Sequence, residues 1–381
     1  MIDFRKRKNE SEVDYIIRIC AAKPHIGTWY DVADIINDEL DRNCNESTYR
    51  KMYRAYEIGE GVPSNENTDV YVMAKATYKL RDERRKLNKH IVDKAKEENV
   101  VDQIKECIEN HIHRTGVITH TPLPSSENDL IVHLSDLHTG IDIDNFFNKY
   151  NDEILKYRLS KYASKVIDVA TLHRSENCFL VLGGDMISGI IHQDLRLENG
   201  YNVIQQVMLA SNYIVEFIET ILPYFNEIKI VSVPGNHSRV SAKKEQNFKG
   251  EFFDSLIPFY IKCYYRGYPN ISIIDGLVDE SIQCFTVRDN LCIATHGDKD
   301  TPKTVADRIT MMLGEKPKII IMGHRHQNGY GSPSGVKVVE GGSCSGIDNF
   351  CIANRIKGEP EQIILVVDND GIDCLYDVNL N

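Results

Sequence analysis

The chain has 381 residues, 42% of them hydrophobic and 27% charged, which are ordinary fractions for a globular protein with a large core. Its formal net charge of −11 excludes a molecule that is basic throughout and binds nucleic acid over its whole surface, although a local basic face remains open. No apolar run approaches the roughly 18 residues of a membrane span, and the charged residues 1–12 do not form a secretory signal. The 10 cysteines contain no Cys-x-x-Cys pair. We therefore expect no membrane partner, reduced thiols and a cytoplasmic location.

Residues 1–60 predict a module of short helices. An apolar pattern over residues 12–20 ends before Pro24, and a second helix begins at Thr28, a candidate N-cap. A third helix opens at Glu46, with an outward basic face of Arg50, Lys51 and Arg54 and an inward face of Tyr49, Met52, Tyr53 and Tyr56. Two short helices joined tightly in this way resemble a helix-turn-helix that contacts DNA. The alternative is a helical cap with a solvated charged face, because acidic and basic residues nearly balance here.

Residues 61–125 predict a linker and a long charged helix. The composition of residues 61–68 is typical of a linker, residues 69–113 form one highly charged helical stretch, and residues 121–126 mark a second boundary. Apolar positions are too sparse for a continuous coiled coil. We expect a solvated spacer helix, which could pack on a neighbouring subunit and make a homo-oligomer.

Residues 126–381 alternate strand and helix, a pattern typical of a layered α/β domain. Helices are expected over residues 145–170, 201–222, 252–264 and 304–313, and late strands over residues 335–339 and 362–367. The remaining strands are five apolar runs, at residues 131–135, 180–182, 228–233, 291–295 and 318–322. In such folds the site lies at the carboxyl ends of the strands.

Those five runs all end in side chains that bind metals. The first ends in Asp136 and His138, and the second ends in Gly183, Gly184 and Asp185. The other three end in Asn236-His237, in His296, and in His324 with His326. Carboxylate, amide carbonyl and imidazole groups bind divalent ions, and an aspartate such as Asp185 can bridge two ions about 3.5–4 Å apart. The i, i+2 pairs can point to one side of a strand. We predict a centre with two divalent metal ions.

In this order the motifs Asp-x-His, Gly-Gly-Asp, Gly-Asn-His, His-Gly-Asp and Gly-His-x-His resemble the calcineurin-like metallophosphoesterase superfamily, over about residues 129–350. The resemblance implies a four-layer β-sandwich flanked by helices, with two metal ions that are often manganese, iron or zinc; we expect Mn²⁺. Matched by position, one ion would be held by Asp136, His138, Asp185 and His326. The other would be held by Asp185, Asn236, His296 and His324. His237 matches the histidine that protonates the leaving oxygen.

Two positions depart from the family pattern. Ser238 and Arg239 follow Gly-Asn-His, where the family often has an acidic residue that orients the histidine. The segment after Asp185 lacks the usual acidic or histidine residue, which His192 could replace. Candidate phosphate-binding cations flank the site at Arg239, Lys243, Lys244 and Arg196. The run after Gly-Asn-His, together with the N-terminal helices, resembles phage-encoded members, which would act in the host cytoplasm.

These observations predict a two-metal phosphodiesterase that acts on nucleic acid, with DNA as the favoured substrate and the N-terminal helices as a docking module. Asp185 and His237 would be its central catalytic residues. One alternative is a phosphatase or diesterase for small-molecule or protein phosphoesters, which the acidic net charge favours. Another is a DNA-binding scaffold with a non-catalytic metal site, which the complete ligand set argues against.

Overall fold

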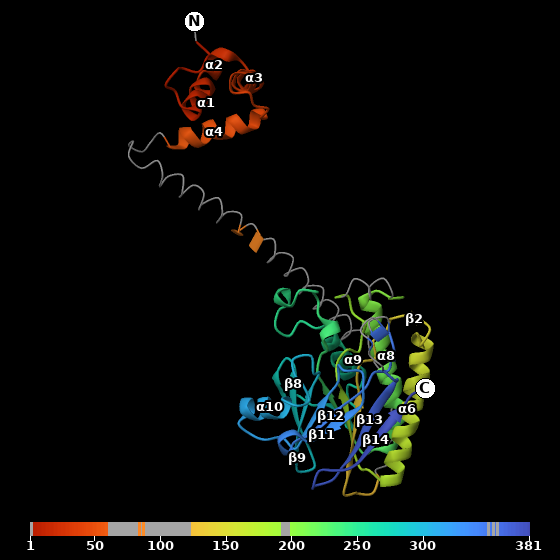
Figure 1. Ribbon diagram of the computed structural model, residues 1–381. Coiled ribbons are helices and arrows are strands. Elements are labelled where there is room, and N and C mark those ends of the chain that lie inside the picture. The colour runs from red at the N-terminus through yellow and green to blue at the C-terminus, as the bar shows by residue number, and fades with distance from the viewer. Residues whose placement is uncertain are drawn as a thin grey trace. The chain divides into compact units, whose positions relative to one another are not determined.

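The computed structural model describes residues 3–59, 83–84, 86–87, 123–191, 199–348, 351–352, 355 and 358–381. The chain divides into two units, Met1–Val100 and Val101–Asn381, and each is described by itself (Figure 1). The long charged helix expected over residues 69–113 lies outside the described residues, apart from the helical positions 83, 84, 86 and 87. The subunit contact predicted for that helix lies outside them too. His192 and Arg196 lie outside them as well. Across the described ranges, every helix is too short or too polar to cross a membrane.

The N-terminal unit is a bundle of the helices α1 (Glu12–Ala21), α2 (Lys23–Ile26), α3 (Trp29–Leu40) and α4 (Glu46–Gly59). The three predicted helices are confirmed. Thr28 caps α3 through a capping box, in which its hydroxyl accepts from the Asp31 N–H and the Asp31 carboxylate accepts from the Thr28 N–H. The short α2 was not predicted; Pro24 fits there because the first turn of a helix does not need its missing N–H.

The core of this unit includes Tyr15, Ile19, Val32 and Ile36, joined by Tyr49 from α4. Met52 and Tyr53 pack against that core, as predicted for the inward face of α4. The inward placement of Tyr56 is wrong, because its side chain is 43% exposed and lies beyond the cluster. The predicted outward face is confirmed, since Arg50, Lys51 and Arg54 are all exposed.

The second unit contains two six-stranded sheets. The first has the order β14-β13-β1-β4-β5-β6 and the second has the order β11-β12-β10-β9-β8-β7. The bounds in the first sheet are β1 Asp129–Leu134, β4 Cys178–Leu182, β5 Ile228–Ser232, β6 Ile271–Ile273, β13 Glu361–Val367 and β14 Ile372–Asn379. Those in the second are β7 Leu277–Asp279, β8 Ile282–Val287, β9 Asn290–Thr295, β10 Ile319–Met322, β11 Gly329–Gly331 and β12 Lys337–Glu340.

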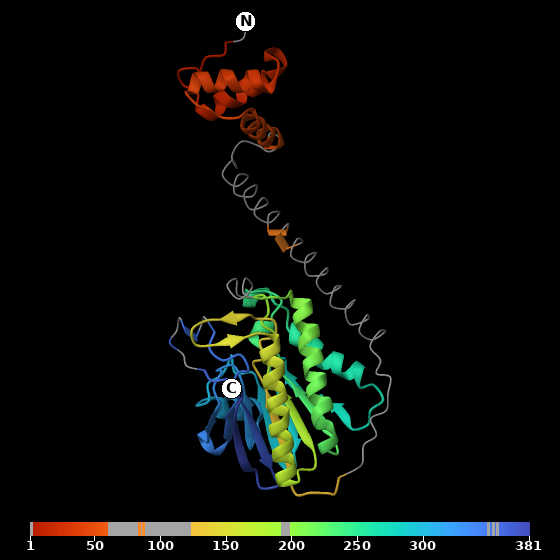
Figure 2. The ribbon, with the colours of Figure 1, turned by 90° about the vertical axis from the view of Figure 1, so that its right-hand side faces the viewer.

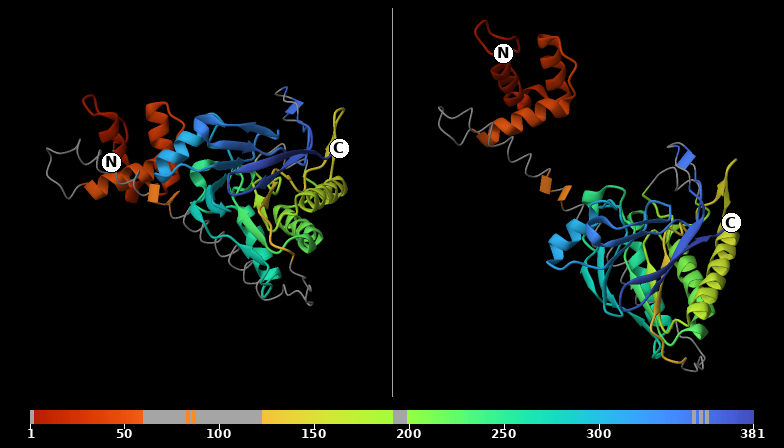
Figure 3. Two further views of the ribbon diagram at one scale, coloured as in Figure 1. Left: turned by 90° about the horizontal axis from the view of Figure 1, so that it is seen from below. Right: turned by 60° about the horizontal axis from the view of Figure 1, so that its bottom comes forward.

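The two sheets pack face to face and carry helices on their outer faces. Between them lies a core that joins Phe179 and Val231 of the first sheet to Phe285 and Ile321 of the second. The other face of the first sheet is covered by α6 (Asp152–His173), α8 (Val203–Ile221) and α9 (Leu256–Tyr264) (Figure 2). The helix α10 (Val305–Leu313) lies on the outer face of the second sheet (Figure 3). It packs there through Ile309. The predicted four-layer sandwich is confirmed.

One predicted helix begins later than expected. Residues 143–150 form a hairpin of β2 (Ile143–Asp144) and β3 (Lys149–Tyr150), so the helix expected from residue 145 starts at Asp152. The Asn145 side chain accepts from the N–H groups of Phe147 and Asn148, which closes a turn that competes with helix formation. The strands β6, β7, β8, β11 and β14 were also not predicted.

Candidate metal centre

The carboxyl ends of the parallel strands bring the predicted ligands into one site. β1, β4 and β5 run parallel, as do β9, β10 and β12. At these strand ends, three groups of side chains have potential ligand atoms within 4.8 Å of one another: Asp136 with His138 and His326, His138 with Asp185 and His237, and Asp185 with His296 and His324. The Asn236 Oδ1 atom lies 3.2 Å from Nε2 of His296. The structure thus brings together all seven predicted ligands and His237.

Five of these residues have left-handed backbone conformations, with φ of 53° at Asp136, 49° at His138, 53° at Asp185, 74° at His324 and 57° at His326. Non-glycine residues adopt this region rarely, and each instance costs about 1–3 kcal/mol. The strands end before these residues, so strand alternation is not what gathers the i, i+2 pairs. Instead, sharp turns after β1, β4 and β10 direct these five side chains into the site.

Glycines allow the segments of the site to approach closely. A Cβ atom on Gly235 would lie 2.0 Å from Oδ1 of Asp185, and one on Gly184 would lie 2.6 Å from the Gly235 nitrogen. Gly184 also has a φ of +92°. The loop before Asn236 therefore packs against Asp185 with no room for a side chain.

Gly235→Ala is expected to lower both the melting temperature and the metal content of the protein. The added methyl group must displace Asp185, and such overpacking costs about 1–3 kcal/mol. Gly200→Ala is the matched control, because no atom of the described residues lies within 4 Å of its added Cβ. Thermal unfolding and elemental analysis of both variants check the prediction, which is wrong if the two variants behave alike.

The site contains two buried pairs of an imidazole and a carboxylate. Nε2 of His296 lies 3.1 Å from Oδ2 of Asp185, and Nε2 of His326 lies 3.4 Å from Oδ1 of Asp136. Burial disfavours the imidazolium, but the Asp185 carboxylate outweighs burial and raises the pKa of His296 to about 10. In the same way Asp136 raises the pKa of His326 to about 10. Burial, together with the neighbouring His237 and His326, lowers the pKa of His138 to about 3.

The donor set fits a divalent metal ion. Oδ1 of Asp136 is buried without a hydrogen-bond partner among the described residues. The Nε2 atoms of His138 and His326 lie 3.1 Å apart. A buried carboxylate oxygen that accepts no hydrogen bond, beside converging imidazole nitrogens, is the arrangement that a borderline divalent ion requires.

Metal uptake is expected to release about two protons near pH 7, because His296 and His326 must lose their protons before they can bind a metal. Folding raises the pKa values of His296 and His326 from 6.5 to about 10. The two imidazole–carboxylate pairs therefore make their full contribution to the stability of the metal-free protein below pH 6.5. That contribution is lost as the pH rises through 10. Metal affinity should accordingly fall as the pH is lowered.

Calorimetric titration with Mn²⁺ at one pH, in buffers of different ionisation enthalpy, measures this release. A heat of binding that does not depend on the buffer contradicts the prediction. The variants His296→Gln and His326→Gln should each reduce the number of protons released.

His237 is oriented by the backbone. Its N–H donates to Oδ1 of Asp185 at 2.7 Å, and its ring Nδ1 lies 3.1 Å from the Ser188 carbonyl. The ring packs edge-on to His138 with centroids 4.7 Å apart. The Ser188 carbonyl thus fixes a ring for which the sequence offers no neighbouring acidic residue.

Of the predicted phosphate-binding cations, Arg239 lies beside the metal centre. Its Nε donates to the Asn236 carbonyl at 2.9 Å. Its Nη1 is buried and has no hydrogen-bond partner in the described part of the chain. Lys243 and Lys244 are exposed.

Two buried polar residues support the site without having been predicted. Asp254 accepts from the Gly235 N–H at 3.0 Å, and burial, with the charge of Asp185, raises its pKa to about 7. The side chain of Gln362 in β13 accepts a hydrogen bond from the Ser135 N–H at 3.0 Å. Its Nε2 donates to the carbonyls of Ser135 and Gly342, both at 2.9 Å. A buried glutamine beside an apolar run is a sequence signal that could have been noted, whereas nothing in the sequence marks Asp254.

Comparisons with known proteins identify both units. A family model described as calcineurin-like phosphoesterase matches residues 130–358, and one described as YonJ N-terminal domain matches residues 1–68. The SPbeta prophage-derived protein YonJ of Bacillus subtilis is 22% identical over 374 residues, which cover 92% of this chain and 91% of that protein. This relative confirms the predicted resemblance to phage-encoded members.

Among solved structures, Vps29 of Entamoeba histolytica in complex with zinc is 11% identical, and an archaeal phosphodiesterase is 14% identical. In each case the match covers 66% of this chain and 99% of the other, with a TM-score of 0.32. The phosphoesterase family model spans more than half of the chain and all of the clustered ligands. The chain belongs to the calcineurin-like phosphoesterase family and is a metal-dependent phosphoester hydrolase.

Proposed function

We propose that the protein is a two-metal phosphodiesterase that cleaves nucleic acid, with DNA as the favoured substrate and Mn²⁺ as the favoured metal, ahead of iron or zinc. The observation that carries the proposal is that Asp185 belongs to two adjoining groups of ligand atoms, one including His138 and the other including His296 and His324. Two ion positions that share one carboxylate account for this arrangement. When bound, such a pair of ions activates water and neutralises charge on the phosphoryl oxygens.

The residues divide into two ligand sets around Asp185. In this proposal Asp136, His138 and His326 hold one ion with Asp185. Asn236, His296 and His324 hold the other with Asp185. The N–H of His324 donates to Oδ2 of Asp136 at 3.0 Å, which links the ends of β1 and β10 and fixes the spacing of the two sets.

His237 and Arg239 would act on the substrate itself. The Ser188 carbonyl holds Nδ1 of His237, which leaves Nε2 as the atom that protonates the leaving oxygen. The buried Nη1 of Arg239 would donate to a phosphoryl oxygen. Both residues lie within three positions after Asn236, so the loop that supplies a metal ligand would also supply the proton donor and the phosphate contact.

Nucleic acid is favoured as the substrate because α4 presents Arg50, Lys51 and Arg54 on an exposed face. Such a face gives an acidic chain a local site for a polyanion. A phosphatase or diesterase for smaller phosphoesters is the second candidate, favoured by the net charge of −11. The two candidates differ in whether cleavage requires a polymer.

A panel of substrates decides between them. The full-length protein with Mn²⁺ is tested on a p-nitrophenyl monoester, the corresponding diester, a cyclic nucleotide, and single- and double-stranded DNA. Cleavage of the diester and of DNA supports the proposal. Turnover of the monoester alone supports the phosphatase, and bound metal without hydrolysis of any ester supports a scaffold.

A further inference from the structure

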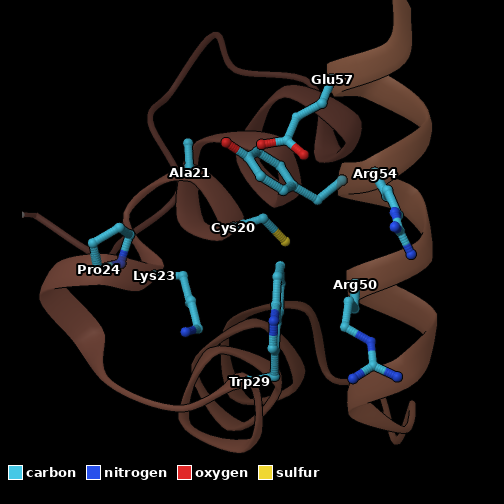
Figure 4. Close-up of a pocket in the computed structure, with 9 residues that line it drawn as sticks. Cys20, Ala21, Lys23, Pro24, Trp29, Arg50, Arg54 and Glu57 are labelled. Carbon is cyan, nitrogen blue, oxygen red and sulfur yellow. The ribbon is translucent and has the colours of Figure 1, made fainter.

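The N-terminal unit contains a pocket of about 380 Å³, a volume within the range of about 300–1,000 Å³ that is typical of small-ligand sites. It lies where the end of α1, the short α2 and the start of α3 meet α4 (Figure 4). The residues on which the argument rests are Lys23, Trp29, Arg50, Tyr53, Arg54 and Glu57. The basic face of α4 in the proposed function shares Arg50 and Arg54 with this pocket, but the pocket itself has no role assigned above.

The wall of the pocket is aromatic. Trp29 is partly exposed at the first position of α3, and its ring centroid lies 6.1 Å from that of Tyr53, with the planes tilted by 53°. Figure 4 shows the indole edge-on, with Lys23 to one side and Arg50 and Arg54 of α4 to the other. A flat ligand can therefore stack on Trp29 while groups at its edges reach the cations.

Three cations and one carboxylate surround this wall. Nη1 of Arg50 lies 3.9 Å from Glu46, a long contact, and Lys23 and Arg54 form no ion pair with any residue in the described ranges. Acidic and basic residues nearly balance in residues 1–60, so the excess of positive charge at this pocket is local. An aromatic wall with surplus cations suits a ligand that is both aromatic and anionic.

We propose that this pocket binds one unpaired nucleobase of a single-stranded nucleic acid. The base stacks on Trp29, the adjoining phosphates contact Lys23, Arg50 and Arg54, and Glu57 accepts from an amino or imino group of the base. A base in a duplex offers no free face for stacking, so the pocket selects single strands. The choice of nucleic acid rests on the proposed function, but binding at this pocket requires no metal.

The single tryptophan of the chain gives a direct signal for the test. The full-length protein is titrated, with chelator present to prevent cleavage, with single-stranded DNA and RNA of about 12 nucleotides and with the matching DNA duplex. Single strands should quench the emission of Trp29 and bind more tightly than the duplex. Quenching by DNA or by RNA supports the proposal, and the stronger of the two identifies the natural ligand. Absence of quenching by both, or equal affinity for the duplex, overturns it.

Substitutions separate the pocket from general charge attraction. Trp29→Ala should weaken binding of a labelled single strand by about 5- to 100-fold, whereas Tyr30→Ala, at a neighbouring side chain that is 70% exposed, should not. Arg54→Gln should weaken binding more than Lys8→Gln, which removes an exposed cation outside the pocket. Equal losses within either pair overturn the proposal, and circular dichroism verifies folding of each variant. If the pocket does not bind single strands, the proposal of hydrolysis at the metal centre is unaffected. Conversely, Asp185→Asn should lose hydrolysis but still bind single strands at the pocket.

Discussion

Asp185→Asn is expected to abolish hydrolysis of every phosphoester that the wild-type protein cleaves and to reduce its metal content. Asp185 is 1% exposed; Oδ2 lies 3.1 Å from Nε2 of His296, and Oδ1 accepts from the His237 N–H at 2.7 Å. Asparagine keeps the shape of the side chain but replaces one ligand oxygen with an NH₂ group and removes the charge. The loss should exceed the roughly 10- to 100-fold drop seen when a residue that only supports a metal ligand is removed.

Asp254→Asn is the matched control, because it makes the same substitution at another buried aspartate beside Gly235. An asparagine there can still accept from the Gly235 N–H through its amide oxygen. We expect this variant to retain its metal and most of its activity. Elemental analysis and the substrate panel measure both variants. Normal metal content and activity in Asp185→Asn would show that Asp185 is not the ligand shared by the two ions.

The clustering of the ligands could be predicted from the sequence because each ligand follows an apolar strand directly. Parallel strands place their carboxyl ends together, so Asp136, Asp185 and Asn236 had to meet. The left-handed turns at Asp136 and Asp185 could not be predicted in this way, because they occur at non-glycine residues.

The partners of the supporting side chains could not be predicted from the sequence, for a different reason. Gln362 bonds to Ser135 across 227 positions, and Asp254 reaches Gly235 from a 3₁₀ turn, Phe253–Ser255, that no motif marks. Such contacts leave no periodic pattern. The hairpin at residues 143–150 was missed because Asn145 turns the chain through its own side chain, which apolar spacing does not reveal.

His237→Gln is expected to separate substrates by their leaving groups. Glutamine is similar in size and can still hydrogen-bond near Ser188, but it cannot deliver a proton. An alkoxide leaving group, as in DNA, needs that proton, so its cleavage should slow by about 10²- to 10⁴-fold. A p-nitrophenolate leaves without protonation, so turnover of the p-nitrophenyl diester should change far less.

The ratio of the two rates, rather than either rate alone, tests the role of His237. A general loss of metal or of folding lowers both rates together, whereas loss of a proton donor lowers only the cleavage of the poor leaving group. His173→Gln, at a histidine whose Nε2 lies 2.6 Å from the Tyr376 hydroxyl away from the predicted ligands, should leave the ratio unchanged. If His237→Gln slows both substrates equally, the His237 ring supports the metal centre through its packing on His138 and does not donate the proton.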